Sequence, residues 1–191
     1  MRREREAQLM RTTWAVTGPP GVGKSTLVSK VMMRAMSRGV IVGGCVTSER
    51  RKGGERVGFN IKNLSTGEEG ELASVKAPLG PRVGRYRVNL MDLANIGGAS
   101  LAGAALSAEL IVIDELGPME LVSPEFRRGV RACLDSQRPL LAVVHERMDD
   151  DLIAEVKSAA GSSTDVTLTN RDSLVDQLSS EVLAALLRKP S

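Results

Sequence analysis

The stretch that decides the fold is GPPGVGKST, which comprises Gly18, Pro19, Pro20, Gly21, Val22, Gly23, Lys24, Ser25 and Thr26. Its first eight residues fit the pattern G-x-x-x-x-G-K-[ST], whose glycines let backbone N–H groups point inward at phosphate oxygens. An apolar strand is expected at residues 12–17 and a helix at about 24–37, so the loop has the flanking elements that the pattern requires. The start of the helix adds a partial positive charge. The sequence therefore predicts a loop that binds the phosphate chain of a nucleotide.

Two side chains at the end of this loop have separate expected roles. Lys24 is expected to reach the β- and γ-phosphates, and Ser25 is expected to supply its hydroxyl group to Mg²⁺. The ordinary alternative is a glycine-rich turn with an unrelated lysine. A chance match to the pattern in a chain of this size is on the order of 1 in 100, and the flanking strand and helix make it rarer.

A second motif, ELIVIDELG at residues 109–117, is an apolar strand that runs into two acids. Taken alone, Asp114 and Glu115 would be a solvated turn after a core strand. With a phosphate-binding loop upstream, Asp114 is expected to hold Mg²⁺ through a water molecule. Glu115 is then placed to polarise a water molecule against the γ-phosphate. Because a kinase must exclude that water, the second acid favours hydrolysis.

The order of the predicted elements indicates the fold class. The chain has 191 residues, which suits a single domain at 12–191 preceded by a charged extension at 1–11. Strands and helices alternate outside residues 48–90, which predicts an α/β fold with a mainly parallel sheet covered by helices on both faces. The glycine-rich region at about 48–90 indicates inserted β-hairpins. The expected strands are 12–17, 40–47, 109–114, 140–144 and 166–168, and the expected helices are 24–37, 92–107, one from 124 onward, 149–159 and 171–188.

The composition excludes several classes of protein. The net charge is +3, and the opening segment, with four arginines and two glutamates, accounts for +2 of it. Aromatic residues make up 2% of the chain, so it offers little for stacking bases, and a nucleic-acid partner is disfavoured. No apolar run approaches the roughly 20 residues that span a bilayer, and the charged N-terminus does not resemble a signal peptide, so a cytoplasmic protein without membrane contact is expected.

Cys45 and Cys133 are expected to be small buried hydrophobic residues rather than a disulfide or a metal site.

Several segments together carry a resemblance to a known family. They are GPPGVGKSTL at 18–27, TSERRKGGERVGF at 47–59, LSTGE at 64–68, GPRVGRYRV at 80–88, DELGPMEL at 114–121 and PLLAVVH at 139–145. With these segments the chain resembles the archaeal and bacterial nucleoside-triphosphatases related to the human cancer-related nucleoside-triphosphatase, which are P-loop NTPases. The resemblance covers nearly the whole chain after residue 12. Arg50 departs from the pattern, which has an aliphatic residue there, and should alter only local packing.

The resemblance implies an activity and further site residues. It implies Mg²⁺-dependent hydrolysis of ATP, GTP, CTP, UTP and TTP to the diphosphate, and a hydrogen bond from Thr26 to the α-phosphate. The late position of the Asp114 strand is similar to the additional-strand, catalytic-glutamate division of P-loop NTPases. There the strand beside the metal-binding strand often ends in a polar sensor, which makes His145 a candidate to sense phosphate or position water. Its ordinary alternative is a polar residue at a strand end.

Arg51 and Arg56 are candidates to bind the nucleotide, because they follow the second strand directly and that position lies near the nucleotide in such folds. A guanine-reading N-K-x-D motif is absent, since Asn170, Arg171 and Asp172 have the wrong middle residue and the wrong spacing. This segment, with Asn170 first, is interpreted as a helix cap, and contact with the base or ribose is its alternative. Besides hydrolysis, the residues alone are compatible with two other functions. One is a nucleotide or nucleoside kinase with the same phosphate-binding loop. The other is a nucleotide-gated switch that binds RNA or protein, although the sequence identifies no protein partner.

Overall fold

The computed structural model describes residues 12–187, so the predicted extension at 1–11 and the last four residues lie outside the described part. Within residues 12–187, nine strands form one sheet in the order β5-β6-β4-β3-β2-β7-β8-β1-β9. The strands are β1 (Thr13–Thr17), β2 (Val42–Lys52), β3 (Glu55–Asn63), β4 (Glu69–Ser74), β5 (Arg82–Val83), β6 (Tyr86–Val88), β7 (Leu110–Leu116), β8 (Leu140–Val144) and β9 (Ser163–Asp165). The helices are α2 (Lys24–Met36), α3 (Leu90–Asp92), the π-helical segment η1 (Leu93–Gly98), α4 (Ala99–Ser107), α5 (Pro124–Asp135), α6 (Asp151–Ala159) and α7 (Arg171–Leu186).

One half of the sheet is parallel and contains β2, β7, β8, β1 and β9. All five residues of β1 and of β8 are buried, which is typical of parallel strands covered on both faces. Strand β8 pairs with β1 on one side and with β7 on the other, with Leu140 opposite both Thr13 and Ile111. The expected additional strand between the phosphate-binding loop and the Asp114 strand is therefore present.

The other half of the sheet is antiparallel and contains β3, β4, β6 and β5, joined to the parallel half along β2. The inserted hairpins predicted at 48–90 are thus a continuation of the same sheet. The second strand was expected to end at residue 47, but β2 runs unbroken to Lys52 because its last residues pair with β3. Gly44 allows β2 to approach β7, since its φ is +106° and a Cβ there would lie 2.1 Å from the Val112 carbonyl oxygen.

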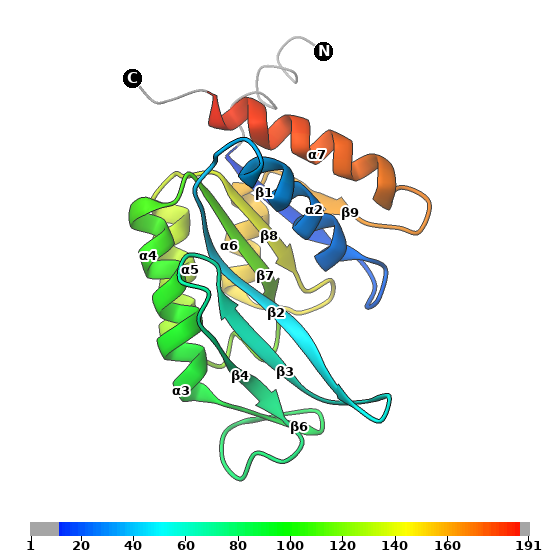
Figure 1. Cartoon of the computed structure of the whole chain (residues 1–191), viewed down its shortest axis with the longest axis vertical. Coiled ribbons are helices and arrows are strands. Elements are labelled where there is room, and N and C mark those ends of the chain that lie inside the picture. Colours follow the sequence, from blue (N-terminus) through cyan, green and yellow to red (C-terminus); the bar gives the residue numbers. More distant parts are fainter. Residues whose placement is uncertain (1–11, 188–191) are drawn as a thin grey trace.

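Helices cover both faces of the parallel half (Figure 1). Helices α2 and α7 pack on one face against residues such as Trp14 and Val16 of β1. Helices α4, α5 and α6 and segment η1 pack on the other face, against residues such as Ile61, Ile111 and Ile113. The indole N–H of Trp14 donates to the Glu181 carboxylate of α7 at 2.9 Å, which joins the first strand to the last helix. The mixed α/β fold predicted from the sequence is confirmed.

Local predictions were mostly confirmed, with one strand misplaced. The last strand was expected at 166–168 but lies at 163–165, because the chain leaves the sheet at Val166, and Leu168 is 70% exposed. The glycine-rich segment at 92–107 is helical as expected, although its first part is π-helical.

Cys45 and Cys133 are free and buried, as predicted, and burial raises the pKa of both thiols. No helix among residues 12–187 combines the length and the apolar character needed to cross a membrane.

Candidate functional site

The phosphate-binding loop joins β1 to α2 at the carboxyl end of the parallel strands. Val22 is buried against the α2 and α7 side of the sheet and anchors the loop, while Pro19, Pro20 and Gly21 are exposed. The ammonium group of Lys24 lies back over the loop and donates to the carbonyl oxygens of Gly18 at 2.8 Å and Pro19 at 3.1 Å. The lysine charge is therefore held beside the start of this loop.

The first turn of α2 lies beside the buried acid of β7. The Ser25 hydroxyl donates to the Asp114 carboxylate at 3.1 Å, although the two residues are 89 positions apart in the sequence. The Asp114–Glu115 peptide bond is cis. Asp114 is 4% exposed, and burial raises its pKa to about 6, against the opposing effects of the Ser25 hydrogen bond and of Lys24. Thr26 is exposed in the same turn of the helix.

This pair of oxygen ligands fits a magnesium ion. A hydroxyl and a carboxylate oxygen are the hard ligands that Mg²⁺ prefers, and Mg²⁺ usually completes its shell with waters and substrate phosphates. Across residues 12–187 no group of three or more His, Cys, Asp or Glu side chains could hold a metal ion. The chemistry of this pair therefore suits a metal bound together with a nucleotide rather than a metal held by the protein alone.

Glu115 and His145 lie on neighbouring strands at the same end of the sheet. Glu115 is half-buried, and its Oε1 lies 3.1 Å from the position that a Cβ of Gly117 would occupy. His145 directly follows β8, and its backbone N–H donates to the Leu116 carbonyl oxygen at 2.9 Å. Its Nδ1 accepts a hydrogen bond from the backbone N–H of Arg147 at 3.3 Å. The structure thus brings His145 next to the strand that carries both acids.

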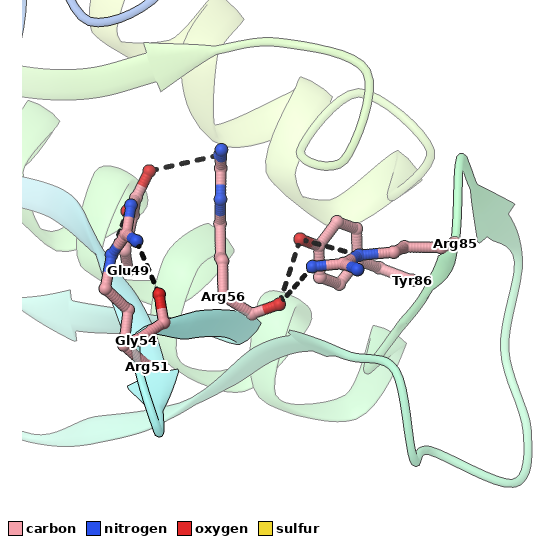
Figure 2. Close-up of polar contacts among 6 residues, drawn as sticks. All are labelled: Glu49, Arg51, Gly54, Arg56, Arg85 and Tyr86. Carbon is pink, nitrogen blue, oxygen red and sulfur yellow. Dashed lines mark hydrogen bonds and ion pairs between the residues drawn. The ribbon is translucent and has the colours of Figure 1, made fainter.

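Arg51 and Arg56 project from the β2–β3 hairpin, and Figure 2 shows both guanidinium groups gathered around Glu49. Arg51 contacts one carboxylate oxygen of Glu49 at 2.6 Å, and Arg56 contacts the other at 3.1 Å. The Arg56 guanidinium also lies over the Phe59 ring, 5.6 Å from its centroid. Glu49 therefore orders the two arginines, and these contacts all lie within the hairpin.

The backbone of the same hairpin is held from a second side. Arg85 and the hydroxyl of Tyr86 both donate to the carbonyl oxygen of Arg56 (Figure 2). The Phe59 and Tyr86 rings pack edge to face with centroids 5.1 Å apart. The turn between β5 and β6 thereby fixes the position of Arg56.

Arg50, which departs from the family pattern, makes its contacts with β3 and β4. Its guanidinium pairs with Glu71 and donates to the Ser74 hydroxyl at 3.1 Å. It lies across Gly58, where a Cβ would come within 2.9 Å of its Nη2. Arg50, Arg51 and Lys52 line one side of a pocket of about 560 Å³.

Two residues beside the predicted site were not assigned to the phosphate-binding loop or to the two acids by the sequence analysis. Arg171, at the start of α7, lies against the phosphate-binding loop, with its Cδ 3.6 Å from the Cβ position of Gly23. Asn170 occupies the N-cap position as predicted, but its side chain contacts Thr167 and Asp165 instead of the helix. The other missed residue is Glu120, which is buried behind Glu115. The only sequence signal for it was its place in the DELGPMEL segment.

A comparison with models of protein families shows which family this chain belongs to. Residues 13–179 match the model of a family described as NTPase. The chain belongs to the NTPase family. A nucleoside-triphosphatase THEP1 from Thermofilum pendens is 46% identical over 91% of this chain and 96% of its own length. A nucleoside-triphosphatase THEP1 from Methanosarcina acetivorans is 44% identical over 90% of this chain and 97% of its own length.

Solved structures of the NTPase family share the fold. The crystal structure of THEP1 from the hyperthermophile Aquifex aeolicus has a TM-score of 0.76 and 31% identity, over 87% of this chain and 96% of that chain. The solution structure of a human cancer-related nucleoside triphosphatase has a TM-score of 0.75 and 32% identity, over 93% of this chain and 99% of that chain. The predicted family and enzyme class are confirmed, and the chain is a nucleoside-triphosphatase.

Proposed function

We propose that this nucleoside-triphosphatase hydrolyses ATP, GTP, CTP, UTP and TTP to the diphosphate and phosphate in a Mg²⁺-dependent reaction in the cytoplasm. The observation that carries the proposal is the contact between Ser25 and Asp114, with Glu115 directly after. It brings a hydroxyl ligand from the helix and a carboxylate ligand from β7 to one point beside the phosphate-binding loop. A hydrolytic site of this kind needs little covalent chemistry from the protein, because charge stabilisation and positioning dominate.

The residues of the loop and of α2 bind the substrate. The backbone N–H groups of residues 21–26 surround the β- and γ-phosphates, since Pro19 and Pro20 have none to donate. Thr26 donates to the α-phosphate. Lys24 exchanges its contacts with Gly18 and Pro19 for phosphate oxygens, which adds a positive charge where negative charge develops. Ser25 and Asp114 hold Mg²⁺, which neutralises phosphate charge when bound.

Glu115 orients the attacking water molecule and accepts its proton. It lies one residue beyond the metal-binding acid and is half-buried, so part of its side chain is accessible to solvent. His145, on the neighbouring strand, senses the γ-phosphate or helps to hold the same water. Arg51 and Arg56 approach the phosphates from the hairpin, and the ion pairs with Glu49 keep them extended until the nucleotide competes for them.

The relatives favour hydrolysis over the kinase and the switch that the sequence left open, because those named above are nucleoside-triphosphatases. Broad use of the five nucleotides is supported by the sequence, which contains no N-K-x-D motif to read guanine. The phosphate chain, which all five substrates share, then supplies the recognition.

Phosphate release from the five triphosphates, with and without Mg²⁺, tests this proposal together with Glu115→Gln. We expect Mg²⁺-dependent release from all five and no phosphorylation of added nucleosides or monophosphates. Glu115→Gln should bind a fluorescent nucleotide with wild-type affinity but lose roughly 10² to 10⁴ in kcat, as for loss of a general base. Turnover at the wild-type rate by this variant would remove Glu115 from the mechanism, and label transferred to an added nucleoside or monophosphate would favour a kinase.

A further inference from the structure

Glu120 is a buried acid with no part in the mechanism above. It lies in the segment that follows β7, six residues after Asp114, and is 4% exposed. Glutamates are almost never buried in this way unless they are paired. Burial raises the pKa of Glu120 to about 8, so the carboxyl group is protonated at neutral pH. A protonated carboxyl group is a hydrogen-bond donor, which an ordinary surface glutamate is not.

The carboxyl groups of Glu120 and Glu115 both lie beside Gly117. The position that a Cβ of Gly117 would occupy lies 3.1 Å from Glu115 Oε1 and 3.2 Å from Glu120 Oε2. Both oxygens therefore border the small space that the missing side chain leaves. Any residue other than glycine at position 117 would push against both acids.

The other groups that face Glu120 are also acidic or neutral. Glu115 and Asp114 of β7 both disfavour its ionisation, and Cys45 of β2 lies close enough to feel its charge. Hydrogen bonds from the backbone N–H groups of Gly117 and of Glu120 itself act in the opposite direction. A neutral Glu120 is the arrangement that places least charge beside these acids.

We propose that Glu120 is a positioning residue for Glu115, and that its protonated carboxyl group donates a hydrogen bond to the Glu115 carboxylate and holds it toward the attacking water. This inference rests on the proposed function of Glu115. A half-buried glutamate has several rotamers, and a fixed donor behind it selects one of them. Since Glu115 acts on the water and not on nucleotide binding, loss of the donor should lower kcat and leave KM unchanged.

Two substitutions at position 120 separate positioning from packing. Glu120→Gln keeps a neutral hydrogen-bond donor of the same shape, and we expect its kcat to stay within about threefold of wild type. Glu120→Leu keeps an apolar body but has no donor, and we expect a fall in kcat of roughly 10- to 100-fold with unchanged KM. Glu155→Leu on α6 is the matched control, because Glu155 makes only an exposed ion pair with Arg131 and should leave kcat unchanged.

The pH profile gives a readout that a purely structural role would not move. Ionisation of Glu120 above about pH 8 removes the donor and places a second negative charge beside Glu115. The kcat of the wild type should therefore fall above pH 8, whereas the kcat of Glu120→Gln should not. This comparison still decides the question if Glu120→Leu fails to fold.

Either of two results would overturn the inference: wild-type kcat in folded Glu120→Leu, or the same alkaline fall in Glu120→Gln as in the wild type. Both are distinct from failure of the proposed function. If Glu115→Gln turns over normally, the role of Glu115 is wrong whatever position 120 does. If Glu115→Gln is inactive while Glu120→Leu is fully active, only the positioning role of Glu120 is wrong.

Discussion

The two halves of the sheet differ in how they are supported. The parallel half is covered by helices on both faces, and its strands β1, β7 and β8 carry the loop at 18–26, the acids Asp114 and Glu115, and His145 at their carboxyl ends. The antiparallel half is packed on one face by η1, while Figure 1 shows no helix over the other face of β3 and β4 in the described part of the chain. Its exposed residues are held by ion pairs such as Glu49 with Arg51 and Arg56.

This difference suggests a division of labour. Precise placement of a metal and a water needs a rigid support, which close packing on both sides supplies. Surface ion pairs contribute about 0 to 1 kcal/mol each, so the arginines of the hairpin can exchange partners at little cost. The parallel half should therefore determine whether the reaction occurs, and the antiparallel half should adjust its rate.

The largest effect on activity is expected at Lys24. Lys24→Ala should lower kcat/KM by roughly 10³-fold or more, because one full charge is lost from the phosphate chain. Its melting temperature should match the wild type, since the lysine donates only to two carbonyl oxygens of its own loop. Phosphate release and calorimetry measure the two quantities, and a variant with near-normal activity would contradict the assignment of residues 18–26.

The next effect should be on stability, at the junction of the two halves. Gly44→Ala should destabilise the fold by about 3 kcal/mol, because the new Cβ would lie 2.1 Å from the Val112 carbonyl oxygen of β7. For a domain of this size the melting temperature should fall by about 6 to 12 °C.

Gly103→Ala is the control for that substitution. A Cβ at Gly103 meets nothing within 4 Å, and the position is helical, so the change should be neutral or stabilise by up to about 1 kcal/mol. Equal melting temperatures for the two variants would show that β2 and β7 are not packed as closely as described.

The smallest effect is expected in the hairpin. Arg56→Ala should lower kcat by roughly tenfold. Loss of an arginine finger lowers the rate by roughly 10³ or more. The effect should be smaller here because Arg51, which pairs with the same Glu49 carboxylate, remains. Its stability should change by less than about 1 kcal/mol. Arg128→Ala on α5 is the control, since Arg128 makes an exposed ion pair with Glu125 and should have no effect on rate. An unchanged kcat in Arg56→Ala would remove the antiparallel half from the reaction.

The parallel half was the more predictable from the sequence. Its strands are short apolar runs between turn and cap signals, and the prediction of residues 140–144 matches β8 at both ends. The predicted helix start at residue 124 was also correct, because α5 begins at Pro124 after the N-cap Ser123, and Ser-Pro-Glu is a strong helix start. The loop at 18–26 and the acids at 114 and 115 were predicted from motifs and their flanking elements, and the structure places Ser25 of this segment 3.1 Å from Asp114. Their roles in binding and hydrolysis stay predictions.

The remaining features depend on contacts that a linear pattern does not contain. The length of β2 is set by its pairing with β3, and the burial of Glu120 is set by how the segment after β7 folds back. Val166 and Leu168 are apolar like a strand, yet the sheet has already ended at Asp165. Arg171 reaches the phosphate-binding loop only because α7 packs on the same face as α2.

The pairing of β1 has a consequence for synthesis on the ribosome. Strand β1 is made well before its two partners in the sheet, which begin only at Leu140 and Ser163. Helix α7, whose Glu181 accepts the hydrogen bond from Trp14, is made later still. The nascent chain must therefore carry an unpaired apolar strand while more than 100 further residues are added, and such strands are prone to aggregate. Nucleotide cannot guide the early stages, since the loop at 18–26 gains its support only after β8, β9 and α7 have been made.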